Sequence, residues 1–299
     1  MSAQKTVDRA YEELTRREVT VGSTRLDTPG NLVIVTVDGD VAKATVVLGQ
    51  IVDPSLIVVE QDAGRTRQAG EKVDYLDAPP LRGGQHITTG LSRCTSAFVG
   101  YRPEVVAGIT TYNYFMLTAG HCGDIGTTWT QAGFPMGRTN ASTFRRTSTD
   151  ADASSIPFVG NARSNQVLLN RSGGINTYAN ITSVETIGSS SDQVGQRACQ
   201  YGTTTAFSTT SCGTMSSRSV TVNYPAEGTL PAQQITGMRC NSFQSEGGDS
   251  GGAVLFSGQA KGSVVGTGSG CLGLYTHVRD AMRATGVSAI KTTAASATP

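Results

Sequence analysis

The first 60 residues show the apolar spacing of two kinds of element. Over residues 4–17, apolar residues recur three and four positions apart with charged residues between them, which predicts an amphipathic helix. Asn31 to Val37 and Ser55 to Glu60 are short runs rich in valine, isoleucine and leucine, as in strands. Asp40 stands before Val41 to Leu48 and is placed to cap a helix there. Together these elements predict a small α/β unit.

The pattern changes after this unit. Residues 61–80 are polar and end in a pair of prolines, which is a linker composition. From Leu81 onward, short apolar runs alternate with clusters of glycine, serine, threonine and asparagine. Such spacing is typical of an all-β sandwich or barrel, and a helix is predicted near its end, over Val278 to Ala284. We therefore expect two parts, residues 1–80 and residues 81–299.

Charge is sparse and nearly balanced in this chain. Of its 299 residues, 16% are charged, and the net charge is +1 at pH 7. This balance argues against a nucleic-acid binder, and without a run of about 18 apolar residues we expect no membrane span. The charges are distributed unevenly along the chain. Residues 1–80 hold 9 basic and 13 acidic residues, hence −4, whereas residues 81–299 hold 15 and 10, hence +5.

The six cysteines all lie beyond residue 93, and none belongs to a CxxC pair. Their spacing is therefore not that of a zinc site, and an even number at long intervals favours three disulfides. Because disulfides form in an oxidising compartment, we expect a secreted protein. The start of the sequence lacks the basic and then apolar pattern of a signal peptide, so we expect the export signal to lie outside this sequence.

Two short motifs carry the candidate chemistry, Leu117-Thr118-Ala119-Gly120-His121-Cys122 and Glu246-Gly247-Gly248-Asp249-Ser250-Gly251-Gly252. Taken alone, such a histidine is usually structural and such a loop is often only a tight turn. A serine, however, is a weak nucleophile until a base takes its proton, and histidine does this near neutral pH. His121 and Ser250 in this order therefore indicate nucleophilic catalysis, in which an acidic group would orient the base.

These motifs resemble those of the chymotrypsin-fold serine endopeptidases, and above all those of the secreted bacterial streptogrisin and alpha-lytic protease branch. The resemblance extends over residues 81–290 and includes the strand-like Cys94 to Phe98. It implies an all-β protease domain built from two six-stranded antiparallel Greek-key β-barrels. It also implies that His121 is the general base, that Ser250 is the nucleophile, and that the N–H groups of Gly248 and Ser250 form the oxyanion hole.

The acid of the triad should lie between the base and the nucleophile in the chain. Asp150 and Asp152 both precede small residues and an apolar strand. Asp152 fits the family pattern better, and Asp150 stays open as the alternative. Asp124 and Asp192 fit the pattern poorly.

The same resemblance implies three disulfides and a specificity pocket. The disulfide pairs would be Cys94–Cys122, Cys199–Cys212 and Cys240–Cys271, of which the last would tie the pocket walls together. The pocket residues would be Gln244, Glu246, Val265, Gly266, Thr267 and Gly268. The glycine-rich wall could admit a large side chain, and no carboxylate stands where a trypsin-like enzyme carries one at the pocket base. We therefore expect cleavage after apolar or aromatic residues.

The N-terminal part resembles the pro-region of this branch, which assists folding and blocks the active site until it is cut away. Leu81 to Ile87 is similar to the mature start of streptogrisins. Cleavage before Leu81 is therefore one expectation, and cleavage after Leu76 is another. The alternative is that residues 1–80 form a permanent accessory domain.

Two other function classes are compatible with parts of these motifs. A catalytically silent binding protein on the same fold would normally lack the histidine or the serine. An α/β-hydrolase esterase would carry its serine before the acid and the histidine, which is not the order here. We expect a serine endopeptidase, made as a zymogen and self-processed. It would act on peptides or proteins as a monomer that needs no cofactor or metal and binds no nucleic acid or membrane.

Overall fold

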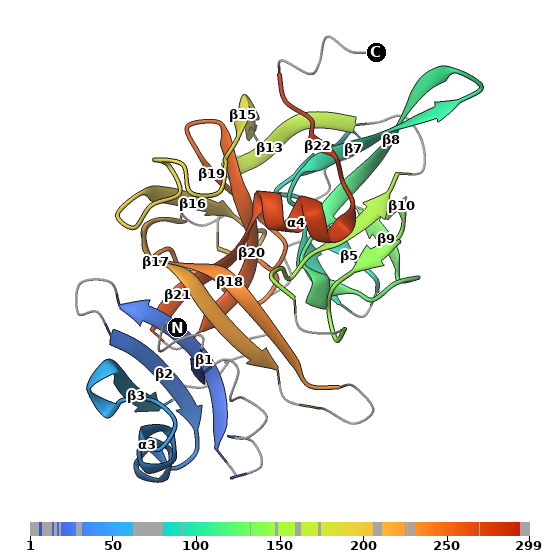
Figure 1. The fold of residues 1–299 in the computed structure, drawn as a ribbon. Coiled ribbons are helices and arrows are strands. Elements are labelled where there is room, and N and C mark those ends of the chain that lie inside the picture. The colour runs from blue at the N-terminus through green and yellow to red at the C-terminus, as the bar shows by residue number, and fades with distance from the viewer. Residues whose placement is uncertain are drawn as a thin grey trace.

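The computed structural model of this chain is mostly β, with a small β/α unit ahead of a larger β domain (Figure 1). It describes residues 6–7, 14, 17, 19–27, 32–61, 80–90, 92–131, 133–146, 149–158, 163–172, 175–205, 211–224, 226, 231–268 and 270–293. The predicted linker and most of the helix predicted over residues 4–17 lie outside the described residues. Among the described helices, none combines the length and apolarity that crossing a membrane requires.

The N-terminal unit is a three-stranded sheet with one described helix. Its elements are β1 (Thr20–Asp27), β2 (Leu32–Asp38), α3 (Val41–Gly49), η1 (Pro54–Leu56) and β3 (Ile57–Gln61). The predicted helix is confirmed, and its cap is Asp40, whose carboxylate accepts hydrogen bonds from the N–H groups of Ala42 and Lys43. The strand predicted from Ser55 begins only at Ile57, because Asp53 accepts the N–H of Ser55 and caps a 3₁₀ turn there.

Strand β1 was not predicted from the sequence, and it joins the N-terminal unit to the larger domain. It pairs antiparallel with β2 on one side, while Ser23, Thr24 and Arg25 pair with β17 (Ser211–Tyr224) on the other. One sheet therefore runs from the larger domain into the small unit, which lies beside the ends of β17 and β18 in Figure 1. Arg25 also lies against Gly270, whose built Cβ would stand 2.8 Å from Arg25 Nη2.

The second half of the larger domain is a closed barrel. Its strands follow the order β16-β19-β20-β21-β18-β17, and β17 pairs back with β16. The bounds are β16 (Arg197–Tyr201), β18 (Gln233–Asn241), β19 (Ala253–Phe256), β20 (Gln259–Gly268) and β21 (Cys271–His277), with β15 (Ser183–Val184) beside β20. Closure gives every one of these strands a hydrogen-bonded neighbour on both sides and so removes exposed sheet edges.

The first half consists of three smaller sheets that enclose their own apolar core around Trp129. These sheets follow the orders β10-β9-β5-β6, β11-β12-β8-β7-β22 and β14-β13-β4. The bounds are β4 (Leu81–Gly83), β5 (His86–Thr88), β6 (Arg93–Thr95), β7 (Val99–Val106), β8 (Ile109–Thr118), β9 (Thr128–Gln131), β10 (Phe134–Arg138), β11 (Ala141–Ser142), β12 (Ser154–Pro157), β13 (Arg163–Ser172), β14 (Ile175–Asn180) and β22 (Ala289–Ile290).

A C-terminal helix joins the two halves. Helix α4 (Val278–Thr285) confirms the helix predicted over this segment, and it ends at Gly286 in the left-handed conformation, with φ +70°. Val278 and Met282 lie in a core cluster with Phe115 from the first half and Leu255 from the second. The helix therefore holds the two halves together beside the segment that contains Asp152.

Candidate active site

The imidazole of His121 is held by Asp152. His121 lies in a 3₁₀ turn (η2, Gly120–Cys122) after β8, and Asp152 precedes β12, which pairs with β8 through Thr118 and Ser154. Asp152 Oδ2 is 2.6 Å from His121 Nδ1, and the N–H of His121 donates to Oδ1 at 2.9 Å. The Asp152 side chain is fully buried. A carboxylate in this position keeps the proton on Nδ1, which leaves Nε2 free to act as a base.

The other candidate acids face elsewhere. Asp150 forms an ion pair with Arg283 on α4, and both side chains are largely exposed. Asp124 pairs with Arg146 at 3.1 Å, also at the surface. Of the two acids that the sequence leaves open, only Asp152 contacts the histidine.

Two hydroxyl groups hold the backbone beside Asp152. The N–H of Asp152 donates to Thr276 Oγ1 at 3.0 Å, and the same hydroxyl lies 3.3 Å from the Asp152 carbonyl. Thr143 Oγ1 accepts from the N–H of Ala153 and donates to the carbonyl of Ala151 at 2.8 Å. Thr276 belongs to the segment Tyr275 to Val278, which resembles the C-terminal end of the same protease branch, but neither threonine was given a role at the site from the sequence. Which distant backbone group a hydroxyl contacts leaves no local sequence pattern.

The loop that carries Ser250 packs directly on the turn that carries His121. Gly251 has φ +83°, and a Cβ there would stand 2.0 Å from Thr118 Oγ1 and 2.9 Å from the Ala119 nitrogen, so only glycine fits. The N–H of Thr95 donates to Ser250 O at 2.8 Å. No hydrogen bond joins Ser250 to His121 in the described residues; Ser250 Oγ donates to Val265 O at 3.4 Å. Such bonds often tighten only when a substrate is bound.

The segment before Ser250 is held by the buried carboxylate of Asp249. This group accepts the N–H groups of Thr204 at 2.7 Å, of Thr205 at 2.9 Å and of Glu246 at 2.9 Å. The carbonyl of Gly248 is held in turn by the hydroxyl of Thr95, at 2.7 Å.

The two predicted oxyanion donors are free in this arrangement. No described residue accepts a hydrogen bond from the N–H of Gly248 or from that of Ser250. Two unused backbone donors next to Ser250 are compatible with the predicted oxyanion hole, and Gly248 has φ +101°, a conformation that favours glycine.

The predicted pocket residues lie on two segments near Ser250. Gln244 and Glu246 are exposed, as is Thr267, while Val265 is buried. Gly266 and Gly268 are partly exposed on β20. Phe243, which directly precedes the first segment and was not among the predicted pocket residues, is buried.

The structure contains three disulfides, and they are the pairs implied by the resemblance. Cys94–Cys122 ties β6 to the histidine turn, and Cys199–Cys212 joins β16 to β17. Cys240–Cys271 joins the end of β18 to the start of β21.

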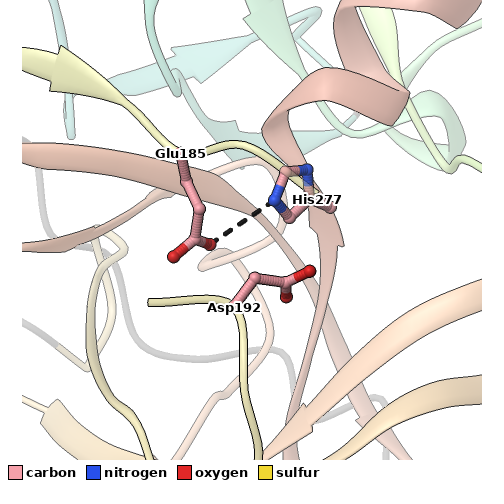
Figure 2. Close-up of side chains that lie close together, drawn as sticks. All are labelled: Glu185, Asp192 and His277. Carbon is pink, nitrogen blue, oxygen red and sulfur yellow. Dashed lines mark ion pairs between the residues drawn. The ribbon is translucent and has the colours of Figure 1, made fainter. Parts of the chain in front are cut away.

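A second group of ionisable side chains lies buried beside α4 (Figure 2). Glu185 forms an ion pair with Lys261, and Glu185 Oε2 lies 3.5 Å from His277 Nε2. Arg239 donates to both oxygens of Asp192, at 3.2 Å and 3.0 Å. Burial acts to raise the pKa of Glu185, but hydrogen bonds from His277 and Lys261 outweigh burial and lower it. Burial also acts to raise the pKa of Asp192, but the hydrogen bonds and positive charge of Arg239 outweigh burial and lower it.

Glu185, Asp192 and His277 are close enough to be considered as metal ligands, but their partners do not fit one. The two carboxylates are already balanced by Lys261 and Arg239, so a divalent cation would add unmatched charge to a buried site. His277 Nδ1 accepts the N–H of Arg279, so in the neutral ring Nε2 carries the proton and cannot coordinate a metal. The group is therefore a buried ion-pair network.

Comparisons with known proteins point to one family. The family model described as Trypsin matches residues 81–284. Streptogrisin-C from Streptomyces griseus is 29% identical over 275 residues, which are 90% of this chain and 50% of that protein. Serine protease 1 from Streptomyces fradiae is 32% identical over 216 residues, covering 70% of this chain and 52% of that protein. The chain thus spans about half the length of either relative.

Solved structures show the same likeness. The crystal structure of Nocardiopsis protease is 26% identical and has a TM-score of 0.54, covering 71% of this chain and 99% of that one. The match therefore covers nearly all of the Nocardiopsis protease and leaves part of this chain unmatched.

Proposed function

Because this chain belongs to the trypsin family of serine proteases, we propose that it is an endopeptidase that uses Ser250, His121 and Asp152 as a catalytic triad. The observation that carries the proposal is the pairing of His121 Nδ1 with the buried carboxylate of Asp152, on a turn against which the serine loop packs. The substrates are peptides or proteins.

The proposed reaction follows from these positions. His121 Nε2 takes the proton of Ser250 Oγ as the oxygen attacks the carbonyl carbon of the peptide bond. The resulting oxyanion is bound by the N–H groups of Gly248 and Ser250, which have no other acceptor among the described residues. His121 then protonates the leaving amine, and water hydrolyses the acyl-enzyme by the same steps in reverse. Asp152 stabilises the imidazolium and remains ionised.

We also propose that residues 1–80 are a pro-region that the enzyme removes itself. The family match begins at residue 81, and the Nocardiopsis protease structure is covered almost completely by only 71% of this chain. The pairing of β1 with β17 supports a role in shaping the second barrel as it folds. The opposite charges of the two parts, −4 and +5, favour their association. The three disulfides indicate an oxidising compartment, and we propose that the protease is secreted.

Hydrolysis of a protein substrate such as casein tests the proposal against the catalytically silent alternative. We expect turnover by the processed wild type and a loss of about 10⁶-fold in kcat for Ser250→Ala, because members of a triad act as a unit. The full-length Ser250→Ala chain should also remain uncleaved between its two parts. Equal turnover by wild type and Ser250→Ala would refute the enzyme assignment.

A further inference from the structure

Buried and exposed side chains alternate from residue 241 to residue 246, as along a strand. Phe243 is on the buried side and only 1% exposed, whereas Ser242 and Gln244 on either side are exposed. A phenyl ring that has lost contact with water must fill a space that other protein atoms enclose.

The ring of Phe243 lies on the backbone of β21. A Cβ built at Gly273 would stand 2.1 Å and 2.2 Å from two carbons of this ring, so the ring occupies the space that a side chain at Gly273 would take. The ring centroids of Phe243 and Tyr275 are 6.1 Å apart. The other members of this buried apolar cluster are Ala198, Met215, Val254 and Val264.

Val264 connects this cluster to the serine loop. The N–H of Gly251 donates to Val264 O at 2.7 Å, and the N–H of Val264 donates to Gly252 O at 2.8 Å. The next residue, Val265, accepts the hydroxyl of Ser250 at its carbonyl and belongs to a different apolar cluster. Phe243 therefore belongs to the same buried cluster as Val264, which lies on the strand that borders the reactive serine.

The cluster that contains the Phe243 ring consists of apolar side chains and Tyr275. One neutral polar side chain, Asn241, lies beside it and accepts the N–H of Phe243 at 3.0 Å. The hydroxyl of Tyr275 is buried and has no hydrogen-bond partner among the described residues. Burial, and then the negative charges of Glu185 and Asp192, raise its pKa, so it stays neutral. None of the described residues that contact Phe243 is charged, so a basic or acidic substrate side chain would find no counter-ion among them.

We propose that the ring of Phe243 closes the primary specificity pocket from below and restricts it to short apolar side chains, such as those of alanine and valine. This inference rests on the proposed function, because it defines the residue that precedes the cleaved bond. A large aromatic side chain would have to displace a ring that is already packed at interior density. The glycine-rich wall of β20 is compatible with both small and large substrate side chains. The buried ring of Phe243 favours the small ones.

Peptide anilides that differ only in the residue before the scissile bond test the proposal on the processed full chain. With alanine, valine, leucine or phenylalanine at that position, we expect kcat/KM to be at least about 10-fold higher for alanine or valine than for phenylalanine. Phe243→Ala should reduce the alanine-to-phenylalanine ratio by at least about 10-fold, mainly through a lower KM for the phenylalanine substrate. Phe243→Leu should give an intermediate ratio.

The ratio within one preparation does not depend on the fraction of folded enzyme, so lower stability of the variants cannot mimic the effect. Phe256→Ala is the matched control, because Phe256 is 38% exposed on β19 and should leave the ratio unchanged. A wild-type preference for phenylalanine, or equal ratios in wild type and both Phe243 variants, would overturn this proposal and leave the proposed function standing. Absence of Ser250-dependent cleavage of any substrate would overturn both.

Discussion

Two aspartates that are nearly equivalent in sequence have different roles in the structure. Asp150 and Asp152 lie two residues apart on the segment that precedes β12, and both precede small residues. The register of β12 against β8 brings Asp152 to the His121 turn, while Asp150 reaches the surface of α4. Local sequence could narrow the acid to this pair. It could not choose between them on physical grounds, because the choice depends on which residues of two distant strands face each other.

Substitution of the two aspartates should separate their roles. Asp152→Asn should lower kcat by roughly 10⁴-fold, because an amide cannot hold His121 with its proton on Nδ1 or stabilise the imidazolium. Asp150→Asn is the matched control. It removes only an exposed ion pair with Arg283, so kcat should stay within about twofold and stability should fall by at most about 1 kcal/mol. Steady-state kinetics decide the matter: a larger loss in Asp150→Asn than in Asp152→Asn would reverse the assignment.

At the scale of elements, the buried ion-pair network connects strands that lie far apart in the sequence. No local sequence pattern shows that these strands are neighbours. Lys261 is on β20, Arg239 is on β18, and His277 ends β21, while both carboxylates come from the segment after β15. Each residue alone resembles an ordinary surface charge in the sequence. The prediction of short strands held, because it needs only local alternation. The network is non-local, and the strand order of the closed barrel creates it.

The stability supplied by Glu185 should depend on pH with a definite sign. Its folded-state pKa is lowered, so its contribution is complete above the unfolded pKa of about 4.3 and is lost as pH falls through the lower folded value. Glu185→Gln should therefore cost about 3 kcal/mol at pH 7, where it leaves Lys261 buried without its counter-ion, and much less at about pH 3. Chemical denaturation at both pH values measures this difference.

The control for this experiment is Glu104→Gln, at an exposed position on β7. It should change stability little at either pH. A cost of Glu185→Gln that is the same at both pH values would show that the negative charge of Glu185 does not stabilise the barrel.

The pairing of β1 with β17 is the element-level contact that attaches the N-terminal unit. The sequence allowed the prediction of β2, α3 and most of β3, but β1 was missed. Its sequence alternates weakly between apolar and polar residues, and the neighbouring residues Ser23 and Thr24 are both buried, so the strand shows no single apolar face. Buried hydroxyl groups need hydrogen-bond partners, and Ser23 Oγ has one in Thr36 Oγ1 at 2.8 Å.

Thr24→Pro tests whether this pairing retains the N-terminal unit. A proline in a central strand removes a ladder donor and is tolerated only at edges. After processing, we expect the fraction of N-terminal unit that co-elutes with the protease in gel filtration to fall about tenfold or more. Thr24→Val keeps the N–H and should behave like wild type. If wild type, Thr24→Pro and Thr24→Val all retain the N-terminal unit equally, the pairing of β1 with β17 is not its main attachment.

At the scale of the whole molecule, a nearly neutral chain consists of two parts of opposite charge. Composition alone argued against nucleic-acid and membrane partners, and it could not indicate a protease. That indication came from His121 and Ser250, whose neighbours form recognisable motifs because catalysis needs particular residues at particular places. Phe243 and Thr276 lack such motifs. The roles we propose for them depend on packing and hydrogen bonding with strands far away in the chain, and these contacts are visible only in three dimensions.

If Ser250 is an activated nucleophile, it should be modified covalently and selectively by a serine-directed reagent. The processed protein is treated with an active-site serine phosphonylating reagent, and the site of the adduct is identified by peptide mass spectrometry. We predict one adduct per chain, on Ser250, with none on Ser250→Ala and much slower labelling of Asp152→Asn. Failure of the wild type to react, or equal labelling of Ser250→Ala, would show that Ser250 is not the nucleophile.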